Sequence, residues 1–151
     1  MAGRRTLGTR RASLCKALYF IANGLLDVYA KGLVHGSLSS HNVFVSSPTF
    51  IQVGVPGTRL AAAVVASDVY AFGILTSELN AFQLPFDDYD FDDEVALTTA
   101  VVDGGLRPTL REKRDDWYRD LVGRCVDADP LNRPTAQDAL LWCSCSIAFV
   151  T

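Results

Sequence analysis

The length and composition of this chain describe a globular protein. Its 151 residues are enough for one sizeable core. With 49% apolar residues, 21% charged residues and a formal net charge of −3, the chain is neither a disordered polyelectrolyte nor a protein that coats nucleic acid. The longest clean apolar run, residues 60–66, is far shorter than the ~18 residues of a membrane-spanning helix, so we expect neither a nucleic-acid partner nor a membrane span.

The first 26 residues contain five basic residues and no acidic one. We interpret residues 1–13 as a basic N-terminal tail that precedes a helix. A mitochondrial presequence has the same composition, so that alternative stays open.

A helix is predicted directly after this tail. Apolar residues from Leu14 to Val28 recur at alternating steps of four and three, which places them on one helical face. Gly32 ends the helix, because glycine adopts the left-handed conformation common at helix ends. A short extended segment, Leu33-Val34, follows, and then a polar loop over residues 35–42.

A small hairpin and a central helix are predicted next. Two β-branched and aromatic runs, residues 43–45 and 50–53, flank a Ser-Ser-Pro-Thr turn and indicate the hairpin. Ser67 and Asp68 predict a helix start, since both stabilise the free N–H groups of a helix N-terminus. Residues 69–79 are apolar on nearly every side, so this helix should be buried.

An acidic run over residues 86–94 leads into a predicted helix over residues 92–102, where carboxylates stabilise the first turn. The alternation Asp88-x-Asp90-x-Asp92 also suggests a calcium loop. Such a loop needs glycine at the next position, which is Asp93 here, so we favour the helix start.

Two more helices complete the predicted fold. Four-residue steps from Trp117 to Cys125 indicate the first, which Pro130 stops. The second starts at Thr135, with Asp138 three residues on, as in a capping box. The prediction is therefore a mainly α domain with one small β-hairpin.

The four cysteines favour free thiols over disulfides or a metal site. They are too few for a secreted disulfide scaffold, they form no C-x-x-C pair, and only two histidines could join them as zinc ligands. Since free cysteines are usually buried, we expect buried thiols in a reducing compartment, the cytoplasm.

The order of these segments resembles the C-terminal lobe of a eukaryotic protein kinase, most closely of the tyrosine-kinase-like group. The similar segments are residues 21–25, 31–35, 67–75, 85–86, 105–108 and 125–134. The resemblance covers residues 14–143, which leaves a short C-terminal tail over residues 144–151.

The family's catalytic loop has the pattern H-R-D-L-x-x-x-N, in which Asp accepts the substrate's proton and Asn holds magnesium. His35, Leu38 and Asn42 match this pattern. Gly36 replaces the Arg and Ser37 replaces the Asp. Because a neutral hydroxyl cannot act as that base near pH 7, we interpret the loop as degenerate.

The family's other functional motifs are altered as well. Val55-Pro56-Gly57 stands in place of D-F-G, and a valine offers no oxygen ligand to magnesium. Ten residues separate Gly57 from Asp68, so the activation segment is shortened and its A-P-E motif is missing. Phe44 stands where the family has a leucine under the adenine, and its larger ring would crowd a nucleotide.

Three residues keep structural roles. Asp68 resembles the carboxylate that binds the catalytic-loop backbone, although its place at a predicted helix start explains it equally well. Arg133 resembles the arginine that pairs with the A-P-E glutamate, and without that partner it must find another carboxylate or reach solvent. We interpret Asn42 as a side chain that bridges backbone groups in a turn.

The resemblance implies a non-catalytic, pseudokinase-like module that acts in protein interaction or in the regulation of signalling, with a protein partner. The glycine-rich loop and its lysine have no counterpart, so ATP and magnesium, the family's cofactors, are not expected to bind well. The alternative is a fragment or incomplete gene model of a protein kinase that phosphorylates proteins using ATP. Nucleotide binding without transfer is a third alternative.

Overall fold

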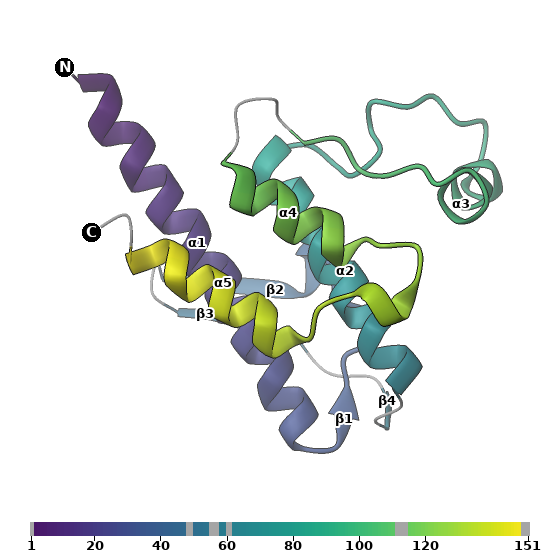
Figure 1. Ribbon diagram of the computed structural model, residues 1–151, viewed down its shortest axis with the longest axis horizontal. Coiled ribbons are helices and arrows are strands. Elements are labelled where there is room, and N and C mark those ends of the chain that lie inside the picture. The colour runs from purple at the N-terminus through teal and green to yellow at the C-terminus, as the bar shows by residue number, and fades with distance from the viewer. Residues whose placement is uncertain (1, 48–49, 55–57, 60–61, 111–114, 149–151) are drawn as a thin grey trace.

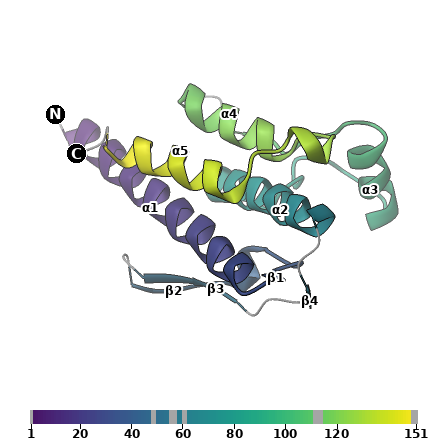
Figure 2. The ribbon, with the colours of Figure 1, turned by 60° about the horizontal axis from the view of Figure 1, so that its bottom comes forward.

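The computed structural model describes residues 2–47, 50–54, 58–59, 62–110 and 115–148. Within these residues the fold is mainly α-helical, as predicted, and its two small antiparallel sheets lie on one side of the helices (Figure 1, Figure 2). The elements in chain order are α1 (Ala2–Ala30), β1 (Leu33–Val34), the 3₁₀ helix η1 (Ser40–Asn42), β2 (Val43–Ser47), β3 (Phe50–Val53), β4 (Thr58–Arg59), α2 (Ala62–Ala81), α3 (Glu94–Val102), α4 (Asp116–Cys125), the 3₁₀ helix η2 (Pro130–Asn132) and α5 (Ala136–Ala148).

The first helix, α1, buries the apolar face that its spacing predicts. Leu18, Ile21 and Leu25 are buried in the main core. Helix α5 lies along α1 (Figure 1), and strand β3 packs against α1 as well. Gly32 follows the helix with φ of +70°, which confirms the predicted helix end.

Both ends of the chain are more helical than their interpretation as tails suggests. Helix α1 begins at Ala2, so residues 2–13 continue the helix, because the arginine, alanine and leucine residues there favour helix. Helix α5 likewise continues through Ala148. The proposed domain boundaries at residues 14 and 143 stay predictions.

The predicted hairpin is confirmed as the antiparallel pair β2–β3, with an irregularity in register between Val45 and Ser47. Gly24 of α1 lets this hairpin approach the helix, because a Cβ there would lie 2.7 Å from Cγ2 of Val53. Strand β1 forms a second sheet with β4, in which Leu33 pairs with Arg59. This second pairing was not predicted.

The central helix α2 begins at Ala62, five residues before the predicted start at Ser67. The start was predicted wrongly because the alanine-rich residues before Ser67 are strong helix formers and extend the helix beyond the local capping signal. Its core side chains, Val69, Phe72 and Leu75, are buried as predicted.

Helix α4 packs closely against α2. A Cβ at Gly73 would lie only 2.7 Å from Cβ of Cys125, so this glycine sets the distance between the two helices. The buried Tyr118 of α4 donates a hydrogen bond from its hydroxyl to the carbonyl of Thr76 in α2. Both contacts fix α2 against α4.

The remaining helices begin at or close to their predicted starts. Helix α3 starts at Glu94, two residues later than predicted, with Asp93 as its cap: the Asp93 side chain accepts from the Ala96 amide at 2.7 Å. At the start of α5, Asp138 accepts from the Thr135 amide and Thr135 accepts from the Asp138 amide, which confirms the capping box. Helix α3 lies apart from α1 and α5 (Figure 1, Figure 2).

The cysteines are free thiols, as predicted. Cys15, Cys125 and Cys143 are buried, whereas Cys145 is exposed, so the prediction of burial is wrong for Cys145. Residues 143 and 145 lie about 200° apart around a helix and therefore cannot share a buried face. Among the described residues, no helix combines the length and apolar character that crossing a bilayer requires.

Candidate functional site

The polar loop over residues 35–42 is held to the central helix by Asp68. The backbone amide of Gly36 donates to one carboxylate oxygen at 2.7 Å, and the amide of His35 donates to the other at 2.8 Å. The hydroxyl of Tyr29, at the end of α1, donates to that second oxygen at 3.2 Å. One carboxylate therefore joins α1, α2 and the start of the loop.

The environment of Asp68 decides between the two explanations that its sequence position allowed. Because α2 begins at Ala62, Asp68 lies inside the helix and not at its positive end. The side chain is 1% exposed, and three hydrogen bonds compensate its burial. Asp68 therefore supports the loop backbone.

Tyr29 acts as a permanent donor to this carboxylate. Burial, and then the negative charge of Asp68, raise the pKa of the Tyr29 hydroxyl well above its ordinary value. The hydroxyl thus keeps its proton at all ordinary pH values. The sequence carried no signal for this residue, since a tyrosine at the end of an amphipathic helix is unremarkable.

His35, the first residue of the loop, is fully buried. Its Nδ1 accepts a hydrogen bond from the backbone amide of Ser37 at 3.3 Å, which holds the ring against the start of the loop. Nε2 is buried and has no hydrogen-bond partner among the described residues. The ring therefore shapes the turn from inside and does not face a substrate.

Asn42 closes the loop at its other end. Its side-chain nitrogen donates to the carbonyl of Ser37 at 2.7 Å, and its own carbonyl accepts from the Gly54 amide at 2.6 Å. The side chain thus contacts one backbone carbonyl of the turn, and the backbone of Asn42 makes the second contact. The loop thus keeps its shape by backbone and amide contacts, while residues 35–42 contain no carboxylate.

The fit of ATP and magnesium, the kinase family's cofactors, to this loop depends on Asn42, Phe44 and residues 55–57. No group of three or more His, Cys, Asp or Glu residues in the described part of the chain is placed to hold a metal ion. Of the Asn42 side-chain amide, the Nδ2 group donates within the loop. Phe44 is 59% exposed on the hairpin, and Val55, Pro56 and Gly57 lie outside the described residues, so the interpretation of that motif is not tested.

Comparison with known proteins now adds to the geometry. No family model matches the chain. It is 27% identical over 159 residues to a probable serine/threonine-protein kinase, roco8, of Dictyostelium discoideum, across 84% of this chain and 8% of that protein. A probable tyrosine-protein kinase of the same organism is 30% identical over 103 residues, across 63% of this chain and 29% of that protein. These relatives support a protein-kinase-like domain.

A third relative of this kinase-like domain comes from a plant. The protein kinase and PP2C-like domain-containing protein of Arabidopsis thaliana is 32% identical over 89 residues, across 50% of this chain and 14% of that protein. The chain thus spans less than a third of the length of each of these relatives. The mainly helical fold with its small sheets is compatible with a kinase C-terminal lobe.

Arg133 contacts two backbone carbonyls and an aromatic ring. Its Nε donates to the carbonyl of Asp127 and its Nη1 to the carbonyl of Ala66, both at 2.9 Å. The guanidinium carbon lies 4.9 Å from the centre of the Tyr70 ring. The expectation of a carboxylate or solvent overlooked backbone carbonyls and an aromatic face as partners.

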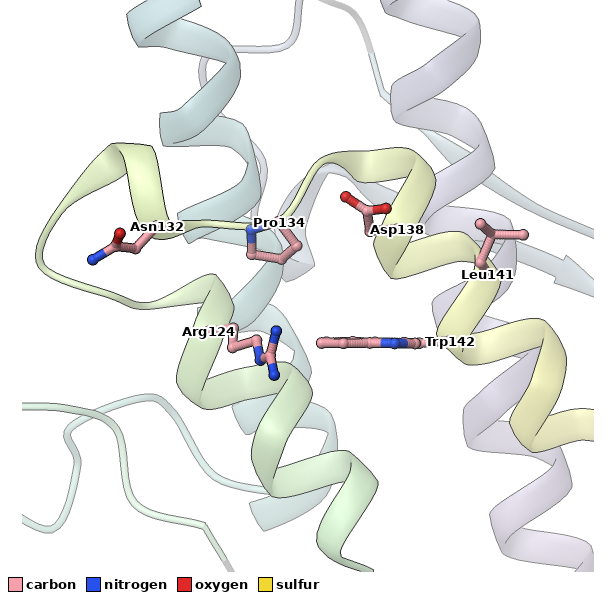
Figure 3. A pocket seen from close by; sticks show the side chains of 6 residues that line it. All are labelled: Arg124, Asn132, Pro134, Asp138, Leu141 and Trp142. Atoms are coloured by element: carbon pink, nitrogen blue, oxygen red, sulfur yellow. The ribbon is translucent and has the colours of Figure 1, made fainter.

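Several clefts lie outside the loop. A largely apolar cleft of about 320 Å³ lies beside the loop over residues 35–42, and its lining includes Leu38, Ile74 and Leu84. A cleft of about 270 Å³ lies between α4 and α5, where Figure 3 shows Arg124 beside the edge of Trp142. A third, of about 310 Å³, contains Arg133 and a second arginine, Arg107, that sequence analysis had not singled out.

Proposed function

We propose that this chain is a non-catalytic protein-kinase-like module, of the tyrosine-kinase-like group, that acts by binding or regulating a protein partner in signalling. The observation that carries the proposal is the loop over residues 35–42. Its backbone is supported at both ends by Asp68 and Asn42, yet Ser37 stands where the kinase pattern has its base.

The chemistry of the loop supports this proposal. A positioned general base typically contributes ~10²–10⁴ in rate, and Ser37 cannot supply it. Asp68, the carboxylate that contacts the loop, cannot replace it, because both its oxygens accept hydrogen bonds and the side chain is buried. What the loop retains is a defined shape.

Exposed apolar side chains support an interaction role. Phe44 and Val45 are 59% and 65% exposed on one strand of the hairpin. Phe82 and Leu84 are 73% and 59% exposed after the central helix. Exposed apolar side chains such as these are candidates for contact with a partner protein.

Phosphotransfer is the direct test. The purified chain is incubated with magnesium, radiolabelled ATP and a generic protein substrate, with heat-inactivated protein as the control. We expect no transfer to the substrate or to the chain itself above that control. A reproducible excess, lost on Asn42→Ala, would refute the proposal.

Nucleotide binding needs a separate measurement. We expect no rise in melting temperature with millimolar ATP and magnesium, because binding to the folded state alone would stabilise the chain by mass action. A rise that disappears without magnesium would favour nucleotide binding without transfer.

A second candidate function is that these residues form part of a longer protein kinase that phosphorylates proteins using ATP. It is favoured by the small share, 8% to 29%, of the two Dictyostelium relatives that the chain covers. Sequencing full-length transcripts tests it. A transcript that adds an upper lobe and a carboxylate-bearing metal motif would favour this candidate, whereas a reading frame identical to the chain would exclude it.

A further inference from the structure

Two arginines share the third cleft. Arg107, which follows α3, and Arg133, which follows η2, line a space of about 310 Å³ together with Tyr70 of α2. Ser67 is the remaining polar residue of the lining, and the apolar residues are Val101, Val102 and Ala128. The described residues of this lining thus carry two positive charges and no acidic side chain.

Neither positive charge is paired with a carboxylate of the described residues. Arg107 donates from Nη1 to the carbonyls of Val101 at 3.2 Å and Leu106 at 2.7 Å. Arg133 donates to two other backbone carbonyls. In the part of the chain that the structure describes, neither arginine forms an ion pair. Each guanidinium has five N–H donors, so both retain donors for a ligand.

Tyr70 adds a third donor. Its hydroxyl is buried and has no hydrogen-bond partner among the described residues. Burial raises the pKa of this hydroxyl, although the charges of Arg107 and Arg133 oppose the shift, so the group is a neutral donor. A buried hydroxyl without a partner gains from any ligand that brings an acceptor oxygen.

We propose that this cleft binds the carboxylate side chain of an acidic residue in a partner protein. Guanidinium groups bind carboxylates in two-point contacts, and the Tyr70 hydroxyl can donate to the same group. The valines at the end of α3 supply an apolar wall for the stem of the acidic side chain and for an apolar neighbour, since Val102 is 71% exposed. The inference names a partner chemistry for the proposed interaction role and rests on it.

The cleft in Figure 3 offers a matched contrast. Its arginine, Arg124, lies 3.5 Å from the carboxylate of Asp120 and 5.2 Å from the centre of the Trp142 ring. Asp138 also lines that cleft, and Figure 3 shows it on the neighbouring helix. Because the Asp120 carboxylate already pairs with this arginine, we expect an external carboxylate to gain less there.

Peptide titration of the full chain tests the proposal. The probe is a blocked pentapeptide, Ala-Leu-Glu-Leu-Ala, and its control has glutamine in place of glutamate. Binding is followed by NMR shifts of labelled arginine side chains at low salt. We expect the glutamate peptide to bind at least tenfold more tightly than the glutamine peptide, and added salt to weaken it.

Variants locate the site. Arg107→Gln should weaken binding of the glutamate peptide at least tenfold, Arg107→Lys should restore part of it, and Arg124→Gln should leave it unchanged. Tyr70→Phe, which keeps the ring under Arg133, should weaken binding about threefold and covers the case in which Arg107→Gln does not fold. Circular dichroism checks the fold of each variant.

Three outcomes would overturn the inference. The first is equal binding of the two peptides, and the second is an equal loss in the Arg107→Gln and Arg124→Gln variants. The third is binding of inorganic phosphate with no binding of the glutamate peptide, which would assign the cleft to phosphate groups. Each leaves the phosphotransfer result untouched, so failure here is distinguishable from failure of the proposed non-catalytic role.

Discussion

Replacing Asp68 with asparagine should destabilise the chain by about 2–3 kcal/mol. Asparagine keeps the shape of the side chain but turns one acceptor oxygen into an NH₂ group, which then faces a donor of His35, Gly36 or Tyr29. Losing one charge-assisted bond costs about 1.5–3 kcal/mol, and the remaining bonds weaken once the charge is gone. Relief of the cost of burying a charge offsets part of this loss.

Urea unfolding at pH 7, followed by tryptophan fluorescence, measures this change as a lower midpoint with an unchanged slope. Tyr29→Phe removes only the third hydrogen bond and should cost about 1 kcal/mol. Asp90→Asn, at an exposed position, should stay within about 0.5 kcal/mol of the parent chain. If Asp68→Asn is as stable as Asp90→Asn, the carboxylate does not hold the loop and the reasoning is wrong.

Three further experiments test the packing. Gly73→Ala should destabilise the chain by about 1–3 kcal/mol, because its Cβ would meet Cys125. Gly123→Ala, where a Cβ would have nothing within 4 Å, should stabilise the chain by up to about 1 kcal/mol. Urea midpoints of the two variants that shift in the same direction would contradict the close approach at Gly73. With a thiol reagent, Cys145 should react rapidly in the folded chain and the other cysteines only after unfolding. Burial raises the pKa of the Cys125 and Cys143 thiols to about 12. These thiols therefore ionise first in the unfolded chain, and the stability of the fold should decrease as pH rises from about 9 toward 12. An unchanged urea midpoint between about pH 8 and pH 10 would contradict this prediction.

The sequence predicted best those features that repeat along the chain. The four-and-three spacing in α1 is periodic, and the hairpin strands are runs rich in β-branched and aromatic residues, so neighbouring residues support the same conclusion. The prediction of where α2 begins was wrong because two local preferences compete. Ser67 favours a helix cap, but the alanines before it favour helix, and the helix extends to Ala62. The β1–β4 pair has two residues in each strand, too few for any periodic signal.

The candidate sites depend on contacts between distant segments. The pattern of the loop over residues 35–42 is visible in sequence, but the hydrogen bonds from Tyr29 and to Asp68 arise only when α1 and α2 pack together. The cleft that holds Arg107 and Arg133 joins three separate segments, and nothing in their spacing indicates that they meet. Tertiary packing therefore decides what local propensity cannot.

The packing of α5 along α1 also bears on how the chain reaches its native state. Cys143 of the last helix and Leu18 of the first belong to one buried cluster, although more than a hundred residues separate them in sequence. During synthesis, the part of α1 that α5 covers stays uncovered until residues 136–148 emerge, although β3 and α2 are made earlier. Contacts of such long sequence separation slow folding, so this apolar surface of α1 is open to a chaperone until α5 has been made.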